Sequence, residues 1–129
     1  MTVITSTVAP FGELTLQTLA MPADTNSHGD IFGGWLLSQM DLAGSVLARR
    51  LSNGRVATVA ISEMTFLRPV PVGAVVKCYT SLLETGRTSM RINIEVWIEL
   101  ESSGEWAKVT EGDFVYVAIS AEGKTRAVR

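Results

Sequence analysis

Cysteine and histidine each occur only once in this sequence of 129 residues. The single cysteine, Cys78, excludes an intrachain disulfide, and a free cysteine in an apolar segment is most often a buried residue. The one histidine, His28, is distant from Cys78 in the sequence, and no ligand spacing typical of zinc or iron is present. We therefore expect no metal site.

The sequence also lacks a long apolar run and an excess of positive charge. Without a run of about eighteen apolar residues we expect no membrane span. The first residues do not combine a basic region with an apolar stretch, so we expect no secretory signal. The formal net charge of -2 and the scattered aromatic residues argue against nucleic acid as a partner. Together these absences predict a cytoplasmic protein.

What the sequence has in abundance is apolar residues. They make up 47% of the chain, and the mean hydropathy of +0.25 is high for a small domain. The length suits one domain over residues 1–129, with a flexible lead-in at 1–12 and a polar tail at 121–129 that frays. Because a small domain buries only part of its surface, the apolar excess indicates that a partner chain covers some of it.

Periodicity predicts one helix and about five strands. A first strand at 14–20 is followed by residues 21–34, which are dense in Pro, Asp, Asn, Ser and Gly and predict a loop. Residues 35–54 contain no proline and repeat apolar residues at helical spacing, and Asn53 with Gly54 provides a C-terminal stop. β-branched and alternating segments predict strands at 55–67, 74–83, 88–100 and 105–120.

This order of elements predicts an α+β domain. Hairpin-length connections between the later strands imply an antiparallel sheet. A long central helix wrapped by a curved antiparallel sheet of about five strands buries the apolar surface of both elements, and that arrangement is the hotdog fold. The open sheet has edges, which proteins usually protect by pairing. We therefore expect a homodimer in which two sheets join edge to edge.

The predicted helix is apolar nearly all round, which is typical of a buried helix. Beside its main apolar stripe lies a second one, formed by Trp35, Leu42 and Val46. A charge on such a helix is costly unless it is used or paired. The narrow polar strip that remains contains Gly34, Ser38, Asp41 and Ser45.

The start of this helix carries the main chemical signal. Gly33 and Gly34 leave first-turn N–H groups open to a ligand, and the helix dipole adds partial positive charge there. The amide of Gly34 is a candidate for polarising a carbonyl oxygen during acyl transfer. Asp41 lies on the same face about 10 Å further along, and its side chain leans back toward Gly34. It is a candidate general base or nucleophile; the alternative is a solvated helix residue.

Residues of the preceding loop have both structural and functional interpretations. Asp30 is either a helix cap or a second catalytic group that positions the water or thioester. Asn26 is either a turn residue or a substrate contact. Phe32 either packs at the helix entry or contacts the substrate with Gly33. His28 lies among turn formers, which favours a loop residue over a general base.

Candidates for binding nucleotide phosphates are cationic. Arg87 lies in a predicted turn with Thr88 and Ser89, and turn amides, hydroxyls and an arginine together make a phosphate cradle. Arg68 and Arg91 are further candidates at a strand end and on a polar face. Each arginine alone has the alternative interpretation of a solvated surface residue.

Three long segments resemble the YciA-type acyl-CoA hydrolases, relatives of brain acyl-CoA hydrolase. MPADTNSHGDIFGGWLLSQMD resembles that family's entry loop and helix. VATVAISEMTFLRPVPVGAVVKCY resembles the strand pair that follows, and GRTSMRINIEVWIE resembles the next strand. The likeness covers most of residues 14–126. It implies a hotdog fold, homodimers that often assemble into hexamers as trimers of dimers, and hydrolysis of acyl-CoA to free acid and CoA without a metal or an organic cofactor.

The resemblance also implies roles for individual residues. The family's helix aspartate falls on Asp41, and its helix-entry glycine amide falls on Gly34. Brain-type relatives have an asparagine that cooperates with the aspartate across the dimer, at a position where this chain has Asp30. Many hotdog thioesterases have a histidine where this chain has Phe32. The turn at residues 86–89 matches the GR[ST]S turn that lies near CoA in relatives.

Two other functions fit parts of the sequence. A hotdog hydratase or dehydratase uses a histidine with an acid, and the one available pair, Asp24 with His28, has a spacing unlike that class. A non-catalytic acyl-CoA-binding or regulatory module would keep the phosphate cradle and tolerate loss of Asp41. The intact acid favours acyl-CoA hydrolysis.

Overall fold

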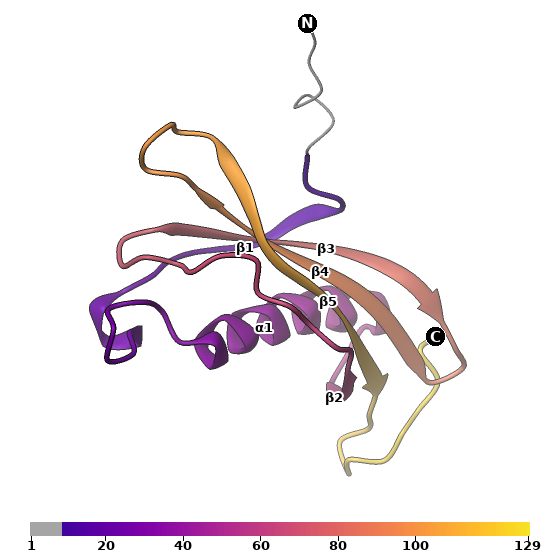
Figure 1. Cartoon of the computed structure of the whole chain (residues 1–129). Coiled ribbons are helices and arrows are strands. Elements are labelled where there is room, and N and C mark those ends of the chain that lie inside the picture. Colours follow the sequence, from indigo (N-terminus) through magenta and orange to yellow (C-terminus); the bar gives the residue numbers. More distant parts are fainter. Residues whose placement is uncertain (1–8) are drawn as a thin grey trace, which may run out of the picture.

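A computed structural model of the chain describes residues 9–129. One long helix lies across one face of a curved sheet (Figure 1). This is the α+β arrangement that the sequence predicts. The elements in chain order are β1 (Glu13–Leu19), the short 3-10 helix η2 (Pro22–Asp24), α1 (Gly33–Ser52), β2 (Val56–Ile61), β3 (Val75–Thr85), β4 (Ser89–Glu99) and β5 (Trp106–Ala118).

The sheet has five strands in the order β1-β3-β4-β5-β2, and every neighbouring pair is antiparallel. The long hairpins β3–β4 and β4–β5 form its centre. The two edge strands are β1, which precedes α1 in the sequence, and β2, which follows it. The helix therefore crosses the concave face between the two edge strands, as Figure 1 shows.

The core lies between α1 and the sheet. Ile92, Ile94 and Val96 alternate along β4 and are fully buried, and Met40 of α1 is fully buried as well. The residues that face the core thus recur at every second position on the strands and at about every 3.6 positions on the helix. The helix begins two residues earlier than predicted, at Gly33, and ends at Ser52.

The end of α1 follows the predicted stop, but its start does not follow the predicted cap. Asn53 adopts the left-handed conformation with φ of 58°, and the N–H of Gly54 donates to the carbonyl oxygen of Arg49 at 3.2 Å. The N-cap residue is Phe32, and no side chain caps the helix. Asp30 is therefore not a helix cap; it forms an isolated antiparallel bridge with Pro71 instead.

The second apolar stripe of α1 is not buried within one chain. Leu42 is 50% exposed and Val46 is 41% exposed, because the sheet covers only one side of the helix. On the neighbouring edge strand β2, Val59 is 56% exposed. The expectation that α1 is buried all round is therefore wrong for the single chain, and an apolar surface remains along α1 and β2.

The strand predicted at 55–67 is shorter, because β2 ends at Ile61. Beyond it the chain contacts β5 through single hydrogen bonds: the N–H of Ser62 donates to Asp113, and the N–H of Leu67 donates to Val109. The side chain of Met64 packs over Gly112, which leaves no room for a Cβ there. This segment becomes a loop that runs beside the start of α1.

Both predicted flexible ends contain ordered contacts. Residues 1–8 of the lead-in lie outside the described residues, but the N–H of Phe11 donates to Oε1 of Glu95 at 3.1 Å on the outer face of β4. In the tail, which the sequence predicts to fray, Val128 is buried and its N–H donates to the carbonyl oxygen of Arg87 at 2.9 Å. Arg126 anchors the same segment to the end of α1.

Candidate active site

Asp41 lies in the middle of α1 and is held by two hydroxyl groups from the sheet. The Thr58 hydroxyl donates to Oδ1 of Asp41 at 2.6 Å. The single O–H of Tyr116 is shared between the carbonyl oxygen of Asp41 at 2.8 Å and its Oδ1 at 3.1 Å. Thr58 and Tyr116 are directly paired across β2 and β5. The interpretation of Asp41 as a merely solvated helix residue does not describe this arrangement.

The two oxygens of the Asp41 carboxylate are unequal. Both hydroxyls reach Oδ1, whereas within residues 9–129 no hydrogen bond reaches Oδ2. A carboxylate held through one oxygen keeps the lone pairs of the other for a proton or for an electrophilic carbon. The side chain is half-buried, so a substrate or a water molecule has access to it.

The electrostatics keep Tyr116 a hydrogen-bond donor. Burial raises the pKa of the Tyr116 hydroxyl far above its usual range, and the negative charge of Asp41 and the hydrogen bond to it raise that pKa further. The phenol therefore stays protonated throughout the pH range in which proteins function. It cannot serve as a base next to Asp41, and its role is to donate.

The amides at the start of α1 are free, as the glycine pair predicts. Within the described residues neither Gly33 nor Gly34 donates its N–H to a backbone or side-chain acceptor. Gly34 is exposed, and a Cβ added there would meet no atom within 4 Å. Beside it lies a mainly apolar cavity of about 390 Å³, lined by Gly33, Gly34, Leu37, Ile61, Ser62, Met64 and Phe66.

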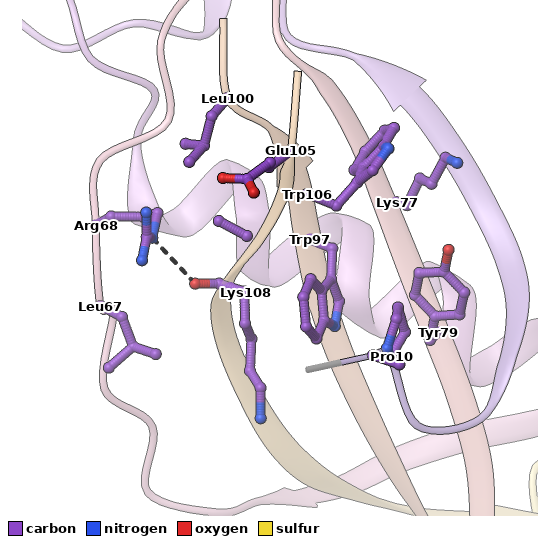
Figure 2. A pocket seen from close by; sticks show the side chains of 12 residues that line it. Pro10, Leu67, Arg68, Lys77, Tyr79, Trp97, Leu100, Glu105, Trp106 and Lys108 are labelled. Atoms are coloured by element: carbon purple, nitrogen blue, oxygen red, sulfur yellow. Dashed lines mark hydrogen bonds between the residues drawn. The ribbon is translucent and has the colours of Figure 1, made fainter. Parts of the chain in front are cut away.

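A cavity larger than this one lies elsewhere. It measures about 760 Å³ and opens on the outer face of the sheet, away from α1. Figure 2 shows Trp97, Trp106 and Tyr79 on its floor, with Lys77 close to the Trp106 ring. Size does not make it the active site, because it contains neither the free amides nor Asp41.

The structure separates the predicted loop residues by role. Asn26 accepts the N–H groups of His28 and Asp30 through Oδ1 at 2.8 and 3.2 Å, which is its predicted turn role. His28 is exposed, and within residues 9–129 its ring has one hydrogen-bond partner, the hydroxyl of the neighbouring Ser27. Phe32 is 52% exposed at the helix entry. Asp30 is half-buried, and its carboxylate has no hydrogen bond within the described residues.

The predicted phosphate-binding residues do not gather around Asp41 in one chain. Arg68 donates from Nε to the carbonyl oxygen of Lys108 at 3.2 Å and lines the outer-face cavity (Figure 2). The turn with Arg87, Thr88 and Ser89 is closed by a bond from the N–H of Gly86 to Ser89 at 2.8 Å. The tail joins that turn to the C-terminal end of α1, whose 20 residues span about 30 Å.

Other nucleophiles and ligand groups contribute nothing to this site. Burial raises the pKa of the Cys78 thiol to about 12, so the thiol is uncharged and inert. Among the described residues, no group of three His, Cys, Asp or Glu side chains is placed to hold a metal ion. In the same part of the chain no helix is both long and apolar enough to cross a membrane.

Sequence reasoning missed Thr58 and Tyr116. A threonine and a tyrosine in alternating strands carry no signal of their own, because they reach Asp41 only through the fold. The one local signal is Gly44, a glycine in the interior of a helix, where glycine is unfavourable. In the structure it lies directly beneath the Tyr116 hydroxyl.

Comparison with known proteins shows the family to which the chain belongs. Residues 28–103 match the thioesterase superfamily. The chain is 57% identical to the acyl-CoA thioester hydrolase YciA of Escherichia coli K12, over 92% of both chains. A hexameric thioesterase from Yersinia pestis has a TM-score of 0.89 at 54% identity and covers 94% of this chain and 98% of its own.

A hexameric broad-specificity acyl-coenzyme A thioesterase also superposes with a TM-score of 0.89, at 47% identity over 94% of this chain and 84% of that one. The same enzyme has been crystallised with an aspartate replaced by alanine. The chain therefore belongs to the thioesterase superfamily, and within it to the YciA-type acyl-CoA thioester hydrolases. The resemblance and the hotdog fold expected from the sequence are confirmed.

Proposed function

We propose that the protein hydrolyses acyl-CoA to a free carboxylic acid and CoA, with Asp41 as the catalytic carboxylate. The observation that carries this proposal is one helix with two chemical features. The start of α1 presents the free amides of Gly33 and Gly34 beside an apolar cavity. About two turns further along, the same helix carries Asp41, whose Oδ2 has no hydrogen bond within the described residues. This arrangement fits a thioester whose carbonyl oxygen is bound by the amides and whose carbonyl carbon is attacked from the side of Asp41.

In this mechanism the Gly34 amide polarises the thioester carbonyl. It donates a hydrogen bond to the oxygen as that oxygen gains negative charge, and the helix dipole adds to the effect. Asp41 takes a proton from a water molecule that adds to the carbonyl carbon, after which the C–S bond breaks and CoA leaves as its thiolate. Alternatively, Asp41 attacks the carbonyl carbon itself, expels the CoA thiolate and forms an anhydride that water then opens to the free acid. Either route uses the free Oδ2. Asp30, with no hydrogen bond on its own carboxylate among the described residues, is the second candidate group for positioning water.

The complete site requires two chains. Within one chain the turn of Arg87, Thr88 and Ser89 and the start of α1 lie toward opposite ends of a 20-residue helix. A second copy paired antiparallel along β2 runs head to tail with the first and brings the turn of one chain toward the helix start of the other. The same pairing covers the exposed Leu42 and Val59. The unit is a homodimer, and the hexameric structures of its relatives favour a trimer of such dimers.

Substrate contacts follow from this assembly. The phosphates of CoA bind Arg87, Thr88 and Ser89, with Arg68 as a further cation. The acyl chain enters the cavity at the start of α1, which Gly33 lines and Phe32 precedes. Asn26 holds the loop that leads into the helix. The chemistry assigned to these residues needs neither a metal nor an organic cofactor. The single buried thiol suits the reducing cytoplasm, where we place the protein.

The test is release of CoA from a panel of short to long acyl-CoAs. Asp41→Asn keeps the shape of the side chain and should lower kcat by about 10²- to 10⁴-fold with a folded protein. Gly34→Val should lower kcat by about 100-fold or more because it blocks the amide. Glu63→Gln is the matched control, since that exposed carboxylate makes no side-chain hydrogen bond within residues 9–129.

Three outcomes of this experiment can be told apart. Turnover in the wild type that disappears in Asp41→Asn and persists in Glu63→Gln supports hydrolysis and the assigned carboxylate together. Tight binding of acyl-CoA without turnover in the wild type favours a non-catalytic acyl-CoA-binding module. Activity of Asp41→Asn within a few-fold of the wild type removes Asp41 from the mechanism.

A further inference from the structure

The contact between α1 and β5 depends on a glycine inside the helix. Gly44 is buried, and a Cβ at this position would collide with the Tyr116 hydroxyl and lie 2.8 Å from its Cε1. It would also lie 2.7 Å from Cδ1 of Ile94. Glycine is among the poorest helix formers, so its presence here requires a reason in the packing. That reason is room for the Tyr116 hydroxyl to reach the helix backbone.

Tyr116 uses this room to contact Asp41 rather than only to fill the core. Its side chain is fully buried and packs beside Phe114 with ring centroids 6.3 Å apart. Packing of the ring fixes the hydroxyl 2.8 Å from the Asp41 carbonyl oxygen and 3.1 Å from Oδ1. The second donor, Thr58, is exposed on the edge strand β2. Of the two hydroxyls, the one from Tyr116 is anchored in the core.

An aspartate carboxylate needs such an anchor if its two oxygens are to differ. The terminal torsion of aspartate is broad and nearly two-fold, so an unrestrained carboxylate exchanges Oδ1 with Oδ2. A donor rooted in the core fixes the plane of the group and assigns Oδ2 to the open side. Displacement of a reacting group by about 1 Å can cost about 100-fold in rate.

We propose that Tyr116 is a positioning residue for thioester hydrolysis, and that the glycine at position 44 leaves the space its hydroxyl needs to reach Asp41. The inference rests on the proposed catalytic role of Asp41. The hydroxyl holds Oδ1, so that Oδ2 faces the thioester carbon or the attacking water. Tyr116 itself touches neither the substrate nor the reacting atoms.

The first test is Tyr116→Phe, which removes one oxygen and keeps the ring packing. With the acyl-CoA that the wild type turns over fastest, kcat should fall about 10- to 100-fold while KM changes less than about twofold. The matched control is Tyr79→Phe, because the Tyr79 hydroxyl lies at the outer-face cavity and should leave both constants unchanged. The folded fraction of every variant is measured by thermal melting, and rates are expressed per folded protein.

The second test approaches the same hydroxyl from the helix. Gly44→Ala displaces the Tyr116 hydroxyl without removing it, and should lower kcat to a similar level. The double variant Tyr116→Phe with Gly44→Ala should lose little more than either single variant, because both changes remove one contact. Ser45→Ala is the helix control, since among the described residues the Ser45 hydroxyl donates only to the carbonyl oxygen of Leu42.

The outcomes separate this inference from the proposed function. If Asp41→Asn is inactive while Tyr116→Phe and Gly44→Ala keep kcat within twofold, the positioning role is overturned and the role of Asp41 stands. If the losses disappear once rates are corrected for the folded fraction, Tyr116 is a packing residue and the proposal is equally wrong. Retained activity in Asp41→Asn removes the proposed function itself.

Discussion

The guanidinium of Arg126 donates to the carbonyl oxygen of Ser52, the last residue of α1, across 3.0 Å. It also donates to the carbonyl oxygens of Ile119 at 2.9 Å and Arg55 at 3.4 Å. A cation at the C-terminal end of a helix interacts favourably with the dipole and with carbonyls that lack helical partners. A Cβ at Gly54 would collide with this guanidinium. Arg126 therefore joins the end of α1, the approach to β2 and the tail.

Arg126→Ala should destabilise the fold by about 1–3 kcal/mol, because several backbone carbonyls lose a charged donor. The variant should also raise KM for acyl-CoA more than it changes kcat, since the tail that Arg126 anchors holds Arg87 through Val128. Urea unfolding and steady-state kinetics measure the two effects. Arg49→Ala, an exposed arginine of the same helix without a side-chain hydrogen bond in residues 9–129, is the control. Equal stability of the two variants would contradict the anchoring role.

Local patterns predict the helix, the five strands and the two groups that lie on one helix. Gly34 and Asp41 are seven positions apart, and helical geometry alone places them on one face. The same reasoning predicts the stop at Asn53, because left-handed backbone and a following glycine are local properties. Each of these inferences uses residues that are close in sequence.

Features that depend on distant residues escape such reasoning. Thr58 and Tyr116 reach Asp41 from β2 and β5. The tail is ordered by contacts with distant residues, through Arg126 to Ser52 and through Val128 to Arg87. Glu95 on the outer face is buried and accepts the N–H of Phe11, which is 84 positions away in the sequence. A sequence pattern predicts whether a segment is a helix or a strand, but it does not predict which distant residues the segment contacts.

The exposed edge strand leads to a prediction about assembly. Val59→Arg places a charge at the centre of β2, where a second copy pairs in the proposed dimer, and should shift the protein to monomers in sedimentation experiments. Turnover should fall in parallel, because the site combines two chains. Val72→Arg, at an exposed valine outside β2 and α1, is the control and should keep the assembly. A Val59→Arg protein that sediments like the wild type would refute pairing along β2.

The outer face of the sheet contains a buried charge whose partner can be removed. Glu95 has a side chain only 8% exposed, and it accepts the Trp97 indole N–H at 2.9 Å. Nζ of Lys108 lies 3.6 Å from Oε2 of Glu95 and also bonds Glu111. The hydrogen bond to Glu111 raises the pKa of Lys108, and the hydrogen bond from Lys108 lowers the pKa of Glu111. Both shifts favour the charged pair in the folded state.

Lys108→Met should therefore destabilise the protein near neutral pH by about 1–3 kcal/mol, chiefly because Glu95 stays buried without its cation. The stability that Glu111 gains is present above its ordinary pKa of 4.5 and is lost as the pH falls through the lower folded-state value. The difference between wild type and variant should shrink below that pH. Urea unfolding across the acid range measures it, with Lys124→Met, an exposed lysine, as the control. A constant difference down to acid pH would show that the methylene stem of Lys108, and not its charge, stabilises this face.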